Sequence, residues 1–198
     1  MGRPRLHDEG MRQRMLDVAA ERVSRHGAEA LSLRKLAAAS GTSTAAVYSL
    51  FGSKAGLLAS LHERAFRRFG AKQAAVGASD DPIEDVIRLG LAYRDSALAD
   101  PHGYRIMFGD AAQPALVDPE LRRAAAETFL PLLDAVRRGV AAGRFPDTVS
   151  PESIATAMWA NVHGLVSLEL GRFIPPQAGD SGGVFEAAIR ANVRGWTR

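Results

Sequence analysis

The sequence contains no cysteine among its 198 residues, which excludes disulfide bonds, thiolate metal ligands and cysteine nucleophiles. No apolar run approaches the roughly 20 residues that a membrane-spanning helix needs, because charged residues or prolines interrupt every stretch. The first residues, MGRPR, are basic but carry no apolar segment of the secretory type. We therefore expect a protein without membrane spans that acts in the cytoplasm.

Lysine is also scarce, and the basic residues as a whole are unevenly placed. Residues 1–72 carry 13 lysines and arginines against 6 acidic residues, whereas residues 73–198 carry 12 against 16. The formal net charge of +3 therefore conceals a positive first third and a mildly acidic remainder. This asymmetry indicates a polyanionic partner for the first third only.

No segment shows the sustained period-two alternation of a β-strand, whereas helical periodicity and helix-ending residues recur along the whole chain. The sequence therefore predicts an all-α protein of about nine helices. Pro119 is expected to open one long helix, and the stretch after Pro175 a mobile connection. The predicted helices cover approximately residues 9–26, 32–40, 43–51, 54–73, 82–99, 104–108, 119–142, 151–171 and 183–196.

Residues 31–58 carry the most informative pattern, LSLRKLAAASGTSTAAVYSLFGSKAGLL. Two short helices joined by a tight turn lie close together, so the first needs a small residue at the contact, and Ala37 meets this need. Gly41, four residues later, is able to adopt the left-handed backbone conformation of such a turn. This spacing is typical of a helix-turn-helix, although small-residue helical hairpins also occur in bundles. Apolar packing would come from Leu36, Val47 and Leu50.

The second short helix ends in Tyr48, Phe51 and, six residues after the tyrosine, Lys54. Together with the preceding pattern, the stretch from about residue 9 to 60 resembles the N-terminal domain of the TetR family of transcriptional repressors. The family pattern of Leu-x-x-Arg-x-(Ile/Leu)-Ala, a Gly-x-Ser turn and Tyr-x-x-Phe-x-x-Lys is matched in order. The resemblance implies a DNA-binding domain with an N-terminal arm over residues 1–53 and an effector-binding and dimerisation domain over residues 54–198.

The resemblance also implies roles for individual residues on double-stranded operator DNA. Tyr48 and Lys54 would hydrogen-bond phosphates, and Arg34 would reach a guanine edge or a phosphate. The recognition helix would enter the major groove with Thr44, Ala45 and Ala46. Further phosphate donors would be Ser32, Thr42 and Ser43. The basic arm resembles minor-groove arms through Arg3 and Arg5.

This recognition surface is unusually small. Ala45 and Ala46 offer only methyl contacts, and no glutamine, asparagine or arginine of this helix makes a bidentate base contact worth ~1–3 kcal/mol. Each DNA role also has a structural alternative: Tyr48 fits a half-buried core position, Arg34 a solvated helix face, and the arm an unstructured terminus. Because the recognition helix lacks a bidentate base contact, we expect sequence specificity to depend on Arg34, Thr44, DNA shape and the arm.

The second signature lies in the domain expected over residues 54–198, here called the body. Trp159, His163 and Gly164 resemble the Trp-x-x-x-His-Gly motif of one C-terminal class within the TetR family. Trp159 and His163 are four residues apart and share a helix face, where they either line an effector pocket or satisfy a buried polar group. The family implies an apolar pocket, and we expect a small apolar or amphipathic effector. The remaining candidates, which fit a plain core equally, are Phe66, Leu89, Tyr93, Tyr104, Met107, Phe108, Phe129 and Leu133.

A homodimer is expected, because a single DNA-binding domain, here called the head, reads only one half-site of an operator. The last two predicted helices suit a two-fold symmetric interface of four helices. Small residues there would allow close approach, and the apolar area would come from Leu165, Leu168, Phe185, Ile189 and Val193.

Enzymatic function finds no support in the sequence. The five histidines show no metal-binding spacing, and no nucleophile elbow, phosphate-binding loop or dinucleotide fingerprint is present. We therefore expect no catalytic residue, metal or cofactor. The sequence favours an effector-released repressor; a TetR-like activator, a ligand-independent regulator and a helical interaction protein or enzyme without DNA binding stay as alternatives.

Overall fold

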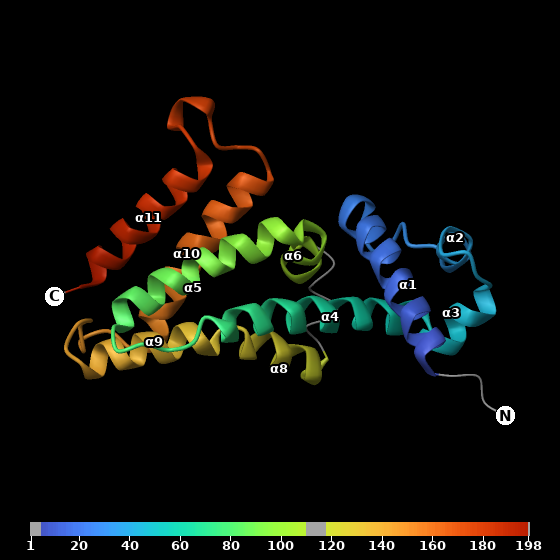
Figure 1. The fold of residues 1–198 in the computed structure, drawn as a ribbon, viewed down its shortest axis with the longest axis horizontal. Helices are drawn as coiled ribbons and strands as arrows, with labels where there is room; N and C mark the ends of the chain where they lie inside the picture. The colour runs from blue at the N-terminus through green and yellow to red at the C-terminus, as the bar shows by residue number, and fades with distance from the viewer. Residues whose placement is uncertain (1–4, 110–117, 198) are drawn as a thin grey trace. The chain divides into compact units, whose positions relative to one another are not determined.

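The computed structural model describes residues 5–109 and 118–197, with the backbone alone for residues 5–8 (Figure 1). These residues form ten α-helices, one short 3₁₀ helix and no strand, which confirms the all-α prediction. The helices are α1 (Arg5–His26), α2 (Leu33–Ala39), α3 (Thr44–Phe51), α4 (Lys54–Ala75), α5 (Pro82–Ala99), α6 (Pro101–Phe108), α8 (Pro119–Glu127), α9 (Leu130–Ala141), α10 (Pro151–Leu170), η1 (Pro176–Ala178) and α11 (Ser181–Trp196). No helix within the described ranges is long and apolar enough to cross a membrane.

The chain divides into two compact units. Unit 1 comprises residues 1–68 and 100–125, and unit 2 comprises residues 69–99 and 126–198. Two of the divisions fall inside helices, because α4 and α8 each contribute residues to both units.

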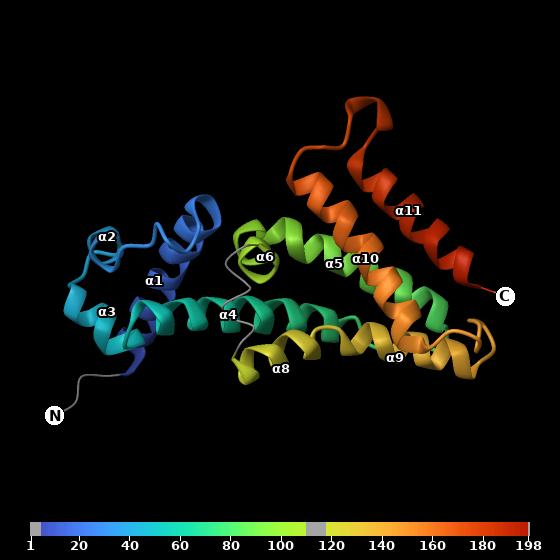
Figure 2. The ribbon, with the colours of Figure 1, turned by 180° about the vertical axis from the view of Figure 1, so that it is seen from behind.

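Unit 1 is organised around α1, which packs against α2 and also against α6, a helix far from it in the sequence (Figures 1 and 2). A hydrogen bond between Ser24 Oγ and His102 Nδ1 (2.5 Å) joins α1 to α6. Arg64 on α4 donates to Asp17 on α1 at 2.7 Å. The fully buried apolar side chains at the centre include Met15, Leu16, Ala19, Leu36, Val47, Leu57 and Leu61.

Unit 2 consists mainly of α5, α9, α10 and α11, which pack against one another in several pairs. Glycines permit the closest approaches: a Cβ on Gly90 would lie 2.9 Å from Ile189 Cδ1, and one on Gly139 would lie 2.4 Å from the Phe145 ring. The buried apolar core includes Val136, Phe145, Ile154, Ala155, Met158, Val166, Phe185, Ile189 and Val193.

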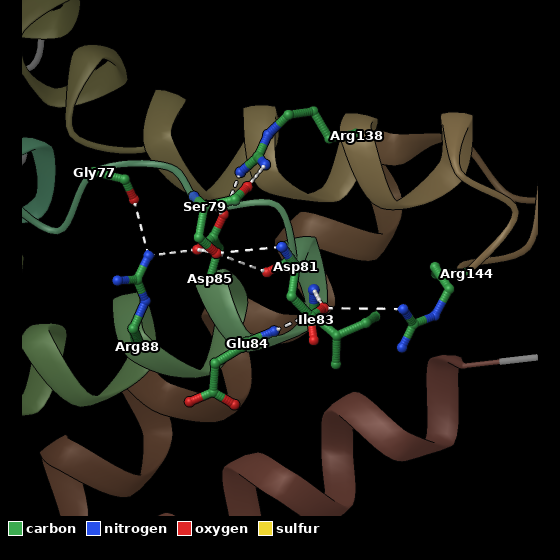
Figure 3. A network of polar contacts seen from close by, with 9 residues as sticks. All are labelled: Gly77, Ser79, Asp81, Ile83, Glu84, Asp85, Arg88, Arg138 and Arg144. Atoms are coloured by element: carbon green, nitrogen blue, oxygen red, sulfur yellow. Dashed lines mark hydrogen bonds and ion pairs between the residues drawn. The ribbon is translucent and has the colours of Figure 1, made fainter.

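A buried carboxylate fixes the start of α5 (Figure 3). Asp85 accepts hydrogen bonds from Ser79 N (2.9 Å), Ser79 Oγ (2.7 Å) and Arg138 Nη2 (2.5 Å), and it also pairs with Arg88. Burial by itself raises the pKa of Asp85, but the hydrogen bonds from Arg138, Ser79 and Arg88 outweigh it and hold the pKa well below its ordinary value. The carboxylate thus stays charged and ties the α4–α5 loop to α9.

Several helix boundaries differ from the sequence-based expectation, including the start of α6, which lies at Pro101 where Asp100 caps it by accepting from Gly103 N at 2.9 Å. The single helix expected from Pro119 to about residue 142 is two helices, interrupted at residues 128–129. Pro131 explains the break, because it lacks an amide hydrogen and its ring clashes with the carbonyl four residues earlier. Helix α11 starts at Ser181, since Asp180 caps it by accepting from Gly183 N at 2.9 Å.

Helix α1 begins at Arg5, earlier than expected. Arg5 is therefore the first residue of a helix, which corrects the prediction that it belongs to the N-terminal arm. Arg3, the other predicted arm residue, lies outside the described residues.

Candidate nucleic-acid interface

Local caps define the two short helices of residues 32–52. Ser32 precedes α2 and accepts from Lys35 N at 3.4 Å, and Ser43 precedes α3 and accepts from Ala46 N at 3.2 Å. Gly41 lies between them with a φ of 67°, in the left-handed region that favours glycine. These caps and the turn set the two helices at a fixed relative position.

Packing then decides which face of α3 is exposed. Ala37 on α2 and Val47 on α3 are 2% and 1% exposed, and Phe51 is also buried. The small side chain of Ala37 allows the close contact that the sequence predicted. The opposite face of α3 is therefore the one that faces solvent.

The residues expected to meet DNA lie on that open face. Tyr48 is 53% exposed, Ala45 is exposed, and Thr44 and Ala46 are half-buried. Arg34, at the start of α2, is exposed. The structure therefore brings Thr44, Ala45 and Tyr48 together as a solvent-accessible ridge of low height, which is compatible with insertion into a groove.

Lys54 is held at the first position of α4. Its Nζ donates to the carbonyl of Glu29 at 3.1 Å, which links α4 to the α1–α2 connection. An ammonium group has three donors, so this bond and a phosphate contact are compatible. Ser53 caps α4 by accepting from Gly56 N at 3.0 Å. Gly56 is required here, because a Cβ would lie 2.1 Å from the carbonyl oxygen of Phe51.

Three predicted phosphate donors also have structural bonds. Ser32 and Ser43 act as helix caps, as above, and Thr42 Oγ1 donates to Met11 Sδ at 3.5 Å. Capping uses a hydroxyl oxygen as acceptor and leaves its hydrogen for another partner, whereas Thr42 directs its hydrogen towards α1.

Two residues near this surface were missed from the sequence. The guanidinium of Arg12 lies 5.6 Å from the centroid of the Phe51 ring and donates to Ser60 Oγ at 3.3 Å. It joins α1 to α3 and α4, and no local spacing indicates such a contact. Ser49 is exposed beside Tyr48, and its position four residues after Ala45 on α3 is the signal that could have identified it.

The candidate effector residues divide between the units. Phe66, Tyr104, Met107 and Phe108 belong to unit 1, where the Phe66 and Tyr104 rings lie 6.5 and 5.0 Å from the Phe108 ring. The other six belong to unit 2: Leu89, Tyr93, Phe129, Leu133, Trp159 and His163.

In unit 2, Tyr93 and His163 form a polar pair. Tyr93 Oη lies 3.0 Å from His163 Nδ1. The Trp159 ring lies 5.9 Å from the imidazole and 6.0 Å from the Phe129 ring. Burial lowers the pKa of His163, so the imidazole is neutral at physiological pH. The motif residues thus share one face of α10, as their spacing predicted.

The predicted dimer residues fall into two groups. Leu168 is 47% exposed and Leu165 half-buried, whereas Phe185, Ile189 and Val193 are 2–3% exposed. The last three therefore use their apolar area within a single chain, which departs from the expectation that they cover a partner.

Among the described residues, no group of three or more histidine, aspartate or glutamate side chains is arranged to hold a metal ion.

Comparisons with known proteins agree with this geometry. Residues 15–61 match the family model described as bacterial regulatory proteins, tetR family, and residues 86–192 match that of the tetracyclin repressor-like C-terminal domain. The HTH-type transcriptional regulator Rv1816 of Mycobacterium tuberculosis is 27% identical, over 98% of this chain and 95% of the relative.

Solved structures show the same fold. A Rhodococcus sp. RHA1 protein of unknown function aligns with a TM-score of 0.80 at 26% identity, covering 95% of this chain and 96% of that one. The TetR family transcriptional regulator PfmR of Thermus thermophilus aligns with a TM-score of 0.73 at 23% identity, covering 91% of this chain and 97% of PfmR.

Proposed function

The chain belongs to the TetR family of transcriptional regulators, which are not enzymes, and on this basis we propose that it is a repressor that a small effector releases from its operator. Because its proposed target is operator DNA, we place its action in the cytoplasm. The observation that carries the proposal is the exposed ridge of Thr44, Ala45 and Tyr48 on a helix whose other face is buried.

The ridge reads the major groove, and the flanking residues hold the phosphates. Tyr48 Oη and Lys54 Nζ contact the sugar-phosphate backbone, which positions α3 without selecting a sequence. Ala45 and Ala46 offer methyl groups to thymine, and Thr44 and Arg34 offer hydrogen bonds. Ser32 and Ser43 add phosphate contacts from the helix starts, and Arg3 and Arg5 add contacts in the minor groove. Thr42 contributes a phosphate contact only when its hydroxyl leaves Met11.

Regulators of this family bind operator DNA as homodimers. We propose that the partner chain packs on the outer faces of α10 and α11, which are neighbours in unit 2. Leu165 and Leu168 supply apolar area there. Small exposed side chains on the same faces permit close helix approach, namely Ala160, Gly164, Gly183, Ala187 and Ala191. Sedimentation of Gly164→Arg as a monomer and of the unaltered chain as a dimer is the expected result; equal sedimentation contradicts this interface.

Effector binding in the body would favour a head spacing that no longer fits successive major grooves, so that operator affinity falls through a population shift. The candidate residues of unit 2, which include Tyr93, Trp159 and His163, are the ones we propose for this role. The one-turn spacing of Trp159 and His163, with their rings 5.9 Å apart, supports assignment to the Trp-x-x-x-His-Gly class.

A gel-shift titration tests the DNA-binding part of the proposal. The unaltered chain is titrated against DNA from upstream of its own gene at two salt concentrations, with unrelated DNA as competitor. We expect a specific complex whose affinity falls steeply with salt, because bound counterions are released from the phosphates. Equal binding to the upstream and unrelated fragments contradicts the proposal.

A further inference from the structure

Unit 2 contains a group of aromatic and uncharged polar side chains, here named the Tyr93 cluster. Ring contacts and one hydrogen bond connect Phe69, Tyr93, His163, Trp159 and Phe129, and Gln73 lies one helical turn after Phe69 on α4. The Phe69 ring meets the Tyr93 ring edge-on, with centroids 4.9 Å apart and an interplanar angle of 82°. Tyr93 in turn bonds His163, as described above. The polar groups of the cluster are thus a phenol, a neutral imidazole, a carboxamide and the indole N–H of Trp159.

Gln73 is the unusual member of the cluster. It is 5% exposed, and its Nε2 has no hydrogen-bond partner. It follows Phe69, whose ring contacts Tyr93, by four residues on α4, so the Phe69 and Gln73 side chains share one helix face. Leaving a buried amide hydrogen unbonded is unfavourable, because it has lost its hydrogen bonds to water without replacement. A group from outside the chain that accepts this hydrogen would recover that free energy.

The buried and half-buried charged side chains of unit 2 already take part in ion pairs, so they leave no counter-charge for a charged ligand. Arg94 binds both carboxylate oxygens of Glu169, at 2.8 and 2.6 Å, and Asp85 pairs with Arg88 and Arg138. Every charged side chain of the described part of unit 2 that is buried or half-buried takes part in an ion pair; the complete set is Asp85, Arg88, Arg94, Arg138, Glu169 and Arg190. An anion or cation entering beside the Tyr93 cluster would therefore be buried without a counter-charge, which is strongly unfavourable.

We propose that the effector is an uncharged molecule with an aromatic body and a hydrogen-bond acceptor, which receives a hydrogen bond from Gln73 Nε2 beside Tyr93 and His163. The proposal rests on the proposed function, because it names the chemical class of the effector in that mechanism. The rings of Phe69, Trp159 and Phe129 supply flat apolar surfaces for the aromatic body. Gln73 becomes the residue that selects an acceptor group.

Matched probes separate charge from shape. The full-length chain is titrated calorimetrically with naphthalene, 2-naphthamide, 2-naphthoate and 2-naphthylmethylammonium, and with the corresponding four biphenyl compounds. We expect the neutral amides to bind at least about tenfold more tightly than the carboxylates and ammonium compounds, since an unpaired buried charge is costly. Binding of either charged class as tightly as the amides, or no binding of the amides up to their solubility limit, overturns the proposal.

A variant tests the role of Gln73. Gln73→Leu removes the donor and keeps a side chain of similar size, so we expect amide binding to weaken about tenfold while naphthalene binding stays unchanged. Gln177→Leu, at an exposed position of η1, is the matched control and is expected to bind both as the unaltered chain does. Unchanged amide binding in Gln73→Leu, or equal loss of amide and naphthalene binding, contradicts the assigned hydrogen bond.

The operator measurement keeps the two proposals distinguishable. If the chain binds its operator but not the amides, the inferred effector class is wrong and the DNA-binding role stands. If it binds the amides but no DNA, the proposed function is wrong. If amides bind without changing operator affinity, binding stands and the assignment of that ligand class as effector is wrong.

Discussion

The DNA-facing part of unit 1 and the core of unit 2 use polar residues in opposite ways. In residues 32–54, the serine caps close bonds three residues along the chain, and Tyr48 and Arg34 face solvent. In unit 2, polar bonds join residues that are 53 to 75 positions apart, as in Asp85 with Arg138 and Arg94 with Glu169. The comparison teaches that local caps set the boundaries of α2 and α3 and that the candidate DNA contacts face outward, whereas charged side chains in unit 2 join helices that are distant in the sequence.

The largest expected effect concerns this internal network. Asp85→Ala leaves Arg88 and Arg138 without their shared carboxylate, and we expect the free energy of unfolding to fall by about 3 kcal/mol. Thermal and denaturant unfolding measure this loss. Asp95→Ala, at an exposed position on the same helix, is the control and should stay close to the unaltered chain. Equal stability of the two variants would show that the network does not hold the body together.

A substitution in the head should lower operator affinity and leave the stability of the fold unchanged. Tyr48→Phe removes one hydroxyl per head, and with about 1 kcal/mol per hydrogen bond in each half of a dimer we expect operator affinity to fall roughly 30-fold. Because the side chain is 53% exposed, the melting temperature should not change. A fall in stability without a change in affinity would mean that the hydroxyl serves the fold.

A smaller effect is expected at the base-reading position. Thr44→Ala leaves the phosphate contacts in place, so it should change the ranking of operator variants with single base-pair changes by about fivefold, at ~1 kcal/mol. Competition binding with a set of such operators measures the ranking. A uniform loss of affinity for every operator would instead make Thr44 a backbone contact.

The smallest effect concerns His163 and pH. Burial lowers its pKa, so between this lowered value and the unfolded value near 6.5 the unfolded chain binds more protons. Its contribution to stability is therefore complete above the unfolded pKa and is lost as the pH falls towards the folded one. His163→Gln should flatten the decline in melting temperature on acidification below about pH 6.5. His26→Gln, at an exposed position, should leave the decline as it is.

The same difference between head and body explains how far sequence reasoning reaches. The caps at Ser32 and Ser43 and the turn at Gly41 involve residues within a few positions of one another, and the turn at Gly41 is as predicted. The all-α class and most helix positions follow from periodicity in the same way. The break before α9 was missed although its signal, Pro131, is local.

Contacts between distant residues could not be predicted in this way. The Asp85 network depends on Ser79 and Arg138, and the stacking of Arg12 on Phe51 depends on how α1 crosses α3. Likewise, an apolar stripe on α11 fits an interface between chains and a core within one chain equally well. Burial of Phe185, Ile189 and Val193 is decided by the position of α5 and α10, which no spacing within α11 contains.

The central claim is that the exposed ridge of α3 is held on DNA by phosphate contacts beside it. The most direct test is the slope of operator affinity against salt for Lys54→Gln, compared with Lys72→Gln at an exposed position of the same helix. The account predicts that Lys54→Gln reduces the slope by about two charges per dimer, with a clear loss of affinity, and that Lys72→Gln changes neither. An unchanged slope and affinity for Lys54→Gln would contradict it.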